Sequence, residues 1–283
     1  MKFVKLPDGA SVPAIGQGTW YLGEHKEREA QEIEALRAGI EAGLTLIDTA
    51  EMYGSGSSER LIGKAIQGYD REKLFLVSKV YPHNAGRAHI FQSCENSLKR
   101  LGTDYLDLYL LHWRGSVPFR ETVECMQELI RRGLILRWGV SNLDIRDMEE
   151  LWRVPGGSGC SVNQVLYHAA SRGIEYSLLP WMRAQGVPLM AYCPLAQAGD
   201  LSGKLYESPV LKEIAAAHHV SVAQVLLAFV LRDGNTIAIP RSGKKAHTLD
   251  NAKAAELILS EEELMRINGA FPAPHRKEPL DIV

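Results

Sequence analysis

The chain has 283 residues, of which 46% are hydrophobic and 23% charged, and its formal net charge is −2. These values are typical of a globular enzyme, and they lack the basic excess of a nucleic-acid-binding protein. The longest apolar stretches have the length of single strands, too short to cross a bilayer. We therefore expect neither a nucleic-acid nor a membrane partner.

The first residues, MKFVKLPDGASVP, lack the apolar core of a signal peptide. The four cysteines are scattered and show no metal-binding spacing: Cys94, Cys125, Cys160 and Cys193. We therefore predict reduced thiols, no metal site and a cytoplasmic location.

Strand-like and helix-like segments alternate along the chain. KFVKL and VPAIG predict an N-terminal hairpin that turns at Asp8-Gly9. Eight apolar runs then predict strands at Ile15–Trp20, Leu44–Thr49, Leu74–Lys79, Leu106–His112, Leu136–Ser141, Val162–Tyr167, Leu189–Cys193 and Thr236–Ile239.

Helical spacing occupies several of the intervals between these strands. Ile33, Leu36 and Ile40 share one face of a helix that ends near Gly43. Further helices are predicted on Phe119, Val123, Met126 and Ile130 before Gly133, on Ile145, Met148 and Leu151, and after the capping-box pair Ser260 and Glu263.

Eight strands alternating with helices predict a (β/α)₈ barrel, as a single domain over residues 1–283. A doubly wound sheet is the alternative, and a GxGxxG motif after the first strand would favour it. Gly16-Gln17-Gly18 begins such a motif, but Tyr21 stands where the third glycine is needed. Partial matches to a phosphate loop, a nucleophile elbow and a metal-binding histidine pair also lack required residues: Gly63-Lys64, Gly139-Val140-Ser141 and His218-His219.

Four ionisable residues stand at or just after the ends of predicted strands: Asp48, Tyr53, Lys79 and His112. Alone, each has an ordinary structural interpretation, such as a helix cap, a loop aromatic, a solvated charge or a buried histidine. Parallel strands, however, present their carboxyl ends at one face of a sheet or barrel, so we expect the four side chains in one polar site.

These residue types suit the reduction of a carbonyl group. A tyrosine with its pKa near ~10 is a poor acid at neutral pH, and a nearby lysine lowers that pKa by favouring the phenolate. A carboxylate next to the lysine would keep the lysine charged, and a neutral histidine can donate a hydrogen bond to a substrate carbonyl. Because no side chain supplies hydride, this chemistry requires a nicotinamide cofactor.

Eight short motifs in the same order resemble the aldo-keto reductase superfamily, from about Gly16 to Asn251: GQGTW, LIDTAEMYG, FLVSKV, DYLDLYLLHW, WGVSN, NQVLYH, AYCPLAQ and IPRS. The resemblance is closest to bacterial members that reduce small aldehydes such as methylglyoxal. It implies a (β/α)₈ barrel whose bottom is closed by the N-terminal hairpin, and a monomer. It also implies Tyr53 as the general acid, Lys79 as its tuning cation, Asp48 as the lysine's partner and His112 as the residue that orients the carbonyl.

The resemblance places an extended NADPH across the top of the barrel. Ser141, Asn142 and Gln164 fall on the positions that bind the nicotinamide carboxamide, and Tyr192 on the position that stacks against the ring. The remaining implied contacts are Gly18 and Thr19 with the ribose, Pro194, Leu195 and the loop to about Ser202 with the pyrophosphate, Arg241 and Ser242 with the 2′-phosphate, and Asp250 and Asn251 with the adenine.

One position departs from the family pattern. His247 stands where many relatives carry an arginine that stacks on the adenine and pairs with the phosphate. A histidine is largely uncharged at pH 7 and has no guanidinium fork. Arg241, with Lys244 nearby, still favours NADPH, and we expect NADH to bind more weakly.

Trp20 and Trp113 fall on positions that line the substrate pocket, although each also fits a packing role. The segment after Pro274 is short, so we expect an open pocket that accepts varied small carbonyls, including aromatic aldehydes. Two alternatives remain open from the sequence. One is an NADPH-binding sensor with negligible turnover, and the other is a barrel isomerase or lyase that uses no nicotinamide.

Overall fold

The computed structural model describes residues 2–196 and 200–282, without the side chains of residues 200–202. Eight parallel strands form one sheet in the order β10-β9-β8-β7-β6-β5-β4-β3, and a separate antiparallel pair, β1-β2, precedes them. The strands are β1 (Phe3–Lys5), β2 (Ser11–Pro13), β3 (Gln17–Gly18), β4 (Leu46–Asp48), β5 (Phe75–Val80), β6 (Leu108–Leu111), β7 (Trp138–Ser141), β8 (Asn163–Leu166), β9 (Leu189–Tyr192) and β10 (Thr236–Ala238).

The sheet closes on itself between its first and last strands. Isolated parallel bridges join Ile15 to Ala238 and Gly18 to Arg241. The amide of Gly16 donates to the carbonyl of Ala238 over 2.8 Å, and the amide of Gly18 donates to that of Pro240 over 3.1 Å. This closure makes a barrel and confirms the predicted fold class.

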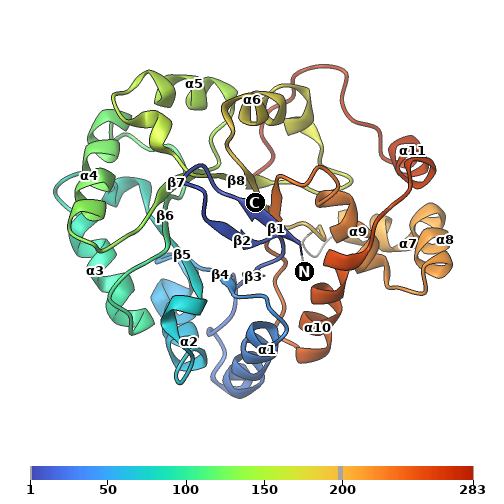
Figure 1. Ribbon diagram of the computed structural model, residues 1–283, viewed down its shortest axis with the longest axis horizontal. Coiled ribbons are helices and arrows are strands. Elements are labelled where there is room, and N and C mark those ends of the chain that lie inside the picture. The colour runs from blue at the N-terminus through green and yellow to red at the C-terminus, as the bar shows by residue number, and fades with distance from the viewer. Residues whose placement is uncertain (1, 197–199, 283) are drawn as a thin grey trace.

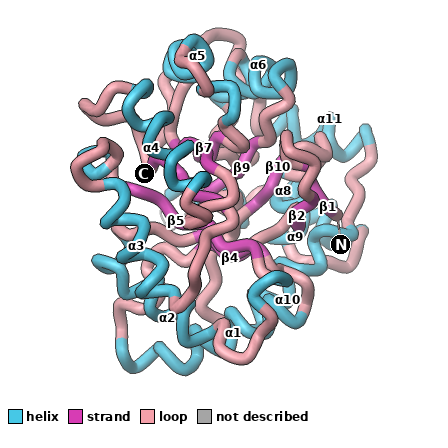
Figure 2. The backbone as a smooth tube through the Cα atoms, turned by 60° about the vertical axis from the view of Figure 1, so that its left-hand side comes forward, coloured by secondary structure: helices cyan, strands magenta, loops and turns pink. Residues whose placement is uncertain are grey.

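Helices surround the strands, as Figure 2 shows. They are α1 (Glu29–Glu41), α2 (Ser57–Ala65), α3 (Ile90–Leu101), α4 (Phe119–Arg131), α5 (Ile145–Arg153), α6 (Leu178–Gln185), α7 (Asp200–Glu207), α8 (Pro209–Ala217), α9 (Val222–Val230), α10 (Lys245–Lys253) and α11 (Glu261–Ala270). Within the described residues no single helix is long and apolar enough to cross a membrane, although α8 and α9, bent by 96°, pass that test as a pair.

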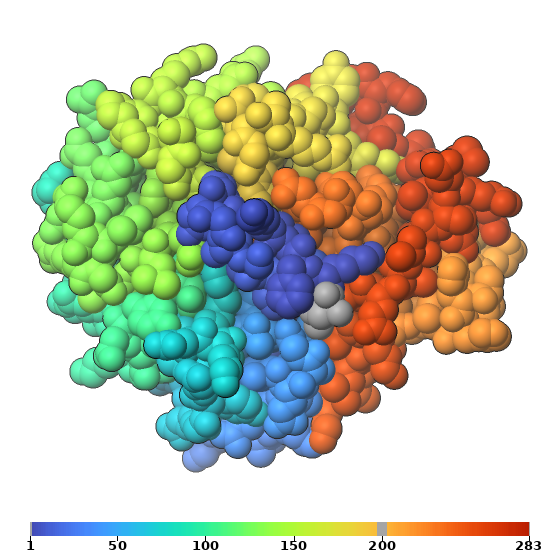
Figure 3. Space-filling view, viewed as in Figure 1, coloured from blue at the N-terminus to red at the C-terminus, as the bar shows by residue number. Residues whose placement is uncertain are grey.

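The N-terminal hairpin lies across the amino ends of the barrel strands. Figures 1 and 3 show it over the centre of that face. Val4 and Val12, one in each strand of the hairpin, are buried. The carboxylate of Asp8, at the turn of the hairpin, accepts a 2.6 Å hydrogen bond from Arg137, which directly precedes β7. The hairpin therefore closes the bottom of the barrel and leaves the carboxyl ends of the strands free to form a site.

All eight predicted strands are present, but most are shorter than their apolar runs. The first is reduced to Gln17–Gly18, because beyond it the chain leaves the sheet and turns toward the site. The predicted helices are also present, and Ser260 and Glu263 form the predicted capping box. Of the four residues that predicted α4, Ile130 is 38% exposed, whereas its neighbour Leu129 packs into the core, because the buried face of α4 passes through Leu129.

Candidate functional site

The ends of adjacent strands bring the four ionisable residues together, as the sequence predicted. Asp48 is the last residue of β4, Lys79 lies near the end of β5 and His112 follows β6. Tyr53 begins the short turn after β4. Since β4, β5 and β6 are neighbours in the parallel sheet, their carboxyl ends meet at one face of the barrel.

Lys79 is the centre of this group and is fully buried. Its Nζ donates to Asp48 Oδ2 over 2.7 Å, to the Thr49 carbonyl over 2.8 Å and to the Tyr53 hydroxyl over 3.2 Å. These contacts use all three ammonium donors. The ammonium therefore has a fixed position against the phenol oxygen.

The buried environment determines the protonation states of the site. Burial raises the pKa of Asp48 and lowers that of Lys79, while the attraction between the two groups opposes both shifts. Burial, with a smaller contribution from the negative charge of Asp48, raises the pKa of the Tyr53 phenol well above its ordinary value. Tyr53 consequently holds its proton at neutral pH.

His112 is neutral in this site. Burial and the charge of Lys79 lower the pKa of its imidazole from 6.5 to about 2. Its Nδ1 is buried without a hydrogen-bond partner among the described residues. An unpaired lone pair in the interior is tolerated better than an unpaired N–H, so the proton belongs on Nε2. The ring of His112 meets that of Tyr53 edge-on, with centroids 5.8 Å apart.

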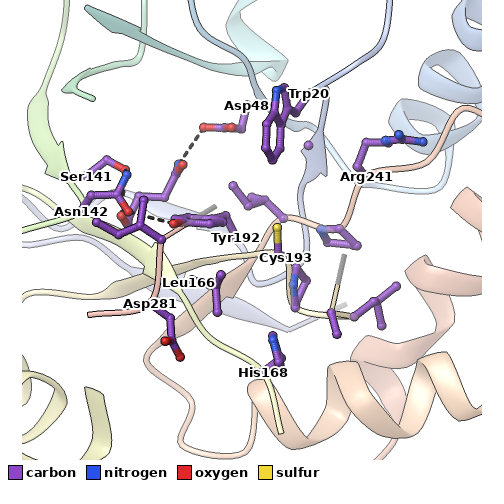
Figure 4. Close-up of a pocket in the computed structure, with 18 of the residues that line it drawn as sticks. Trp20, Asp48, Ser141, Asn142, Leu166, His168, Tyr192, Cys193, Arg241 and Asp281 are labelled. Atoms are coloured by element: carbon purple, nitrogen blue, oxygen red, sulfur yellow. Dashed lines mark hydrogen bonds between the residues drawn. The ribbon is translucent and has the colours of Figure 1, made fainter. Parts of the chain in front are cut away.

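A cavity of about 900 Å³ opens over these residues. Thirteen of the predicted site residues line it: Gly18, Thr19, Trp20, Asp48, Tyr53, His112, Ser141, Asn142, Gln164, Tyr192, Pro194, Leu195 and Arg241. In the view of Figure 4, Trp20, Asp48 and Arg241 lie on one side of Tyr192, and His168 and Asp281 lie on the other.

Polar side chains at the ends of β7, β8 and β9 form one wall of the cavity. The Tyr192 hydroxyl donates to Asn142 Oδ1 over 2.9 Å, and Asn142 Nδ2 donates to the His112 carbonyl over 3.2 Å. Gln164 Nε2 donates to Asp48 Oδ1 over 2.8 Å, and Ser141 Oγ donates to the Gln164 carbonyl over the same distance. The predicted carboxamide-binding group is thus hydrogen-bonded directly to the predicted catalytic group.

The cavity wall also carries the exposed cation Arg241, which follows the last barrel strand. Ser242 Oγ donates to the Lys244 carbonyl over 2.9 Å and accepts from the Lys244 amide, so these two residues form a compact turn. Lys245 instead pairs with Glu34 at 3.1 Å. His247 lies on the exposed part of α10, one turn after Lys244, and does not line the cavity.

Several other predicted residues lie away from the cavity. Asp250 accepts a 2.5 Å hydrogen bond from Ser221, and Asn251 is buried. Trp113 packs against His112 with ring centroids 4.8 Å apart. The side chain of Ser202 lies outside the described residues, and its contact with a pyrophosphate stays a prediction.

The sequence did not indicate the contribution of the C-terminal segment. Asp281 and Ile282 line the cavity, and Ser171 donates a hydrogen bond to Asp281. Lys277 pairs with Asp144 at 2.6 Å and holds the segment against the start of α5. The short segment thus adds two residues to the cavity wall, and the open pocket expected from its length stays a prediction.

The barrel, the Asp-Tyr-Lys-His group and the motif order define one class of protein. The chain matches the Aldo/keto reductase family over residues 14–271 and belongs to that family. It is 56% identical to methylglyoxal reductase YeaE of Escherichia coli over 282 residues, which cover 100% of this chain and 99% of that protein.

Solved structures show the same similarity. An aldo/keto reductase from Klebsiella pneumoniae in complex with NADP and acetate superposes with a TM-score of 0.97 at 54% identity. The match covers 100% of this chain and 99% of that chain. A second Klebsiella pneumoniae structure, in complex with NADPH, has the same TM-score, identity and coverage.

Proposed function

We propose that this protein reduces small aldehydes and ketones to alcohols with NADPH, and that methylglyoxal and aromatic aldehydes are among its substrates. The observation that carries the proposal is the buried Asp48–Lys79–Tyr53 group beside the neutral His112, at a cavity that Arg241 also lines. The 56% identity to a methylglyoxal reductase supports the substrate class.

The lining of the cavity fits a dinucleotide. Ser141, Asn142 and Gln164 offer hydroxyl and amide groups for a carboxamide, and the ring of Tyr192 offers an aromatic face for a nicotinamide. Arg241 offers a guanidinium for a phosphate. NADPH, when bound, supplies the hydride for the carbonyl carbon. The prediction of this cofactor agrees with the NADP and NADPH in the two Klebsiella pneumoniae structures.

The protein's own groups act on the carbonyl oxygen. His112 Nε2–H donates a hydrogen bond that orients and polarises the carbonyl. As the carbon–oxygen double bond becomes a single bond, the oxygen takes the proton of the Tyr53 hydroxyl, and Lys79 stabilises the phenolate that remains. Asp48 holds Lys79 in place throughout, and Tyr53 is reprotonated before the next turnover. We further propose that the protein acts as a monomer in the cytoplasm.

The experiment is a turnover assay at about 340 nm, the absorption of reduced nicotinamide, with methylglyoxal or benzaldehyde as substrate. We expect oxidation of NADPH with both aldehydes and slower turnover with NADH. Binding of NADPH without turnover on either aldehyde would contradict the proposed reaction and favour a cofactor sensor. Absence of both binding and turnover would contradict the cofactor as well.

A further inference from the structure

Tyr21 lines the cavity in an unusual backbone conformation. Its φ is +64°, in the left-handed region where a bulky side chain is strained. Its side chain is also 46% exposed, so burial of apolar surface does not explain the conformation. Strain that persists at the edge of a site points to a functional constraint.

The ring of Tyr21 belongs to a stack of side chains that line the cavity. Tyr53 and Trp20 stack with centroids 6.2 Å apart, and Trp20 and Tyr21 stack at 4.6 Å with an interplanar angle of 15°. The guanidinium carbon of Arg241 lies 6.0 Å from the centroid of Tyr21, within the range of a cation–π interaction. The stack therefore runs from the proposed general acid, Tyr53, to the guanidinium of Arg241.

The closure of the barrel sets the separation of Tyr21 and Arg241. Gly18 and Arg241 form a bridge between the first and last strands. A Cβ atom at Gly18 would lie only 2.6 Å from the Ile239 carbonyl oxygen, so the two segments are as close as their backbones allow. Tyr21, three residues after Gly18, and Arg241 are thus held close together by the contact between the first and last strands of the barrel.

Among the described side chains, no carboxylate forms an ion pair with Arg241, and the face of Tyr21 is the aromatic contact of its guanidinium. Position 247 is a histidine, and Lys245 is paired with Glu34. Among the described cations near this site, Arg241 is the one that lines the cavity, with Lys244 nearby, so recognition of a phosphate depends in part on how well Arg241 is oriented.

We propose that Tyr21 is a positioning residue for Arg241, and that it favours NADPH over NADH by holding the guanidinium toward the adenosine 2′-phosphate. This inference rests on the proposed function, in which Arg241 binds that phosphate. NADH has no phosphate at this position, so its affinity is independent of the orientation of Arg241. Loss of the aromatic face should weaken NADPH binding about 2- to 5-fold, as expected for a cation–π contact at an exposed site.

Calorimetric titration of NADPH and of NADH tests the proposal in five proteins: wild type, Tyr21→Leu, Tyr21→Phe, Arg241→Ala and the double variant Tyr21→Leu/Arg241→Ala. Leucine and phenylalanine share the unfavourable φ, so the comparison isolates the aromatic face. We expect Tyr21→Leu to raise the Kd for NADPH alone and Tyr21→Phe to retain the wild-type Kd ratio of the two cofactors. In the double variant, Tyr21→Leu should add nothing to the loss caused by Arg241→Ala.

The outcomes separate this inference from the proposed function. Arg241→Ala should weaken NADPH about 10- to 100-fold, as for a charged hydrogen bond, and spare NADH. An equal loss for both cofactors would remove Arg241 from the phosphate site and overturn both proposals. If Arg241→Ala is selective for NADPH but Tyr21→Leu weakens both cofactors equally, or its effect persists in the double variant, only the role of Tyr21 is overturned.

Discussion

At the scale of single residues, the site depends on three hydrogen bonds from one buried ammonium group. Lys79 contacts the carboxylate of Asp48, the Thr49 carbonyl and the hydroxyl of Tyr53. Burial raises the pKa of the phenol, which therefore holds its proton at neutral pH. In the proposed reaction, the ammonium would stabilise the phenolate after the proton has left. Lys79 would then serve both the structure of the resting site and its chemistry.

The first prediction concerns the acid itself. Tyr53→Phe removes the hydroxyl while keeping the ring that stacks with Trp20. We expect turnover of methylglyoxal to fall about 10²- to 10⁴-fold, the usual contribution of a general acid, with NADPH affinity nearly unchanged. Steady-state assays and calorimetric titration measure the two quantities. Tyr69→Phe, which removes a surface hydroxyl bonded to Glu41, is the matched control, and full activity in Tyr53→Phe would refute the assignment.

Removal of the ammonium should impair both stability and turnover. Lys79→Met leaves Asp48 buried without its partner, which should lower the free energy of unfolding by about 3–5 kcal/mol. Urea denaturation measures this loss. In Asp48→Leu/Lys79→Met the buried charge is gone, so we expect part of the stability to return while turnover stays abolished. Recovery of turnover in the double variant would show that the ion pair has only a structural role.

At the scale of elements, the carboxyl ends of β4 to β9 carry the residues at the centre of the site. Helix α10 carries Asp250, for which the structure shows another contact than the one the resemblance implies. The resemblance places Asp250 on the adenine. In the structure Asp250 accepts a hydrogen bond from Ser221, the N-cap of α9, and its backbone carbonyl accepts one from Gln224. The carboxylate thus joins α10 to the start of α9.

These contacts predict a structural role for Asp250. Asp250→Ala should lower the free energy of unfolding by about 0.5–1.5 kcal/mol, the value of one hydrogen bond, and leave the Kd for NADPH unchanged. Asp250→Asn keeps an oxygen that accepts from Ser221 and should retain most of the stability. A several-fold increase in the Kd for NADPH, with unfolding unaffected, would instead support the adenine contact.

Most of the strands and helices could be predicted from the sequence. Every barrel strand was found from its apolar run, because strands covered on both faces leave no polar interruptions. Their ends were less accurate, since apolar residues continue past the last ladder hydrogen bond, as they do around Gln17–Gly18. On α4, helical spacing alone gave no reason to choose Leu129 over Ile130, and packing against the barrel decided between them.

At the scale of the whole molecule, the C-terminal segment completes the cavity through contacts that no local pattern predicts. Ser171 and Asp281 are 110 positions apart, and Lys277 and Asp144 are 133 apart. Such pairs depend on the closed barrel, which brings segments far apart in the sequence together. The same assembly buries His168 in the cavity wall, where burial lowers the pKa of the imidazole and the nearby Asp281 carboxylate opposes that shift in part.

Two buried histidines should make the stability of the fold depend on pH. Burial lowers the pKa of His168 to about 4 and that of His112 to about 2, from the ordinary 6.5. Below pH 6.5 the unfolded chain binds a proton at each imidazole that the folded protein does not bind. The associated stability is therefore present above pH 6.5 and is lost as the pH falls, by up to about 1.4 kcal/mol per pH unit for each group.

Denaturant unfolding between pH 7 and pH 4 measures this dependence. We expect His168→Gln to flatten the decline by the contribution of one group, because glutamine does not bind a proton in either state. His89→Gln, at an exposed position on the outside of the barrel, should keep the wild-type slope. If His168→Gln and the wild type decline in parallel, His168 binds a proton equally in the folded and unfolded states. The acid sensitivity of the fold then arises from other groups, and the wall beside Asp281 admits enough water to solvate a charged imidazole.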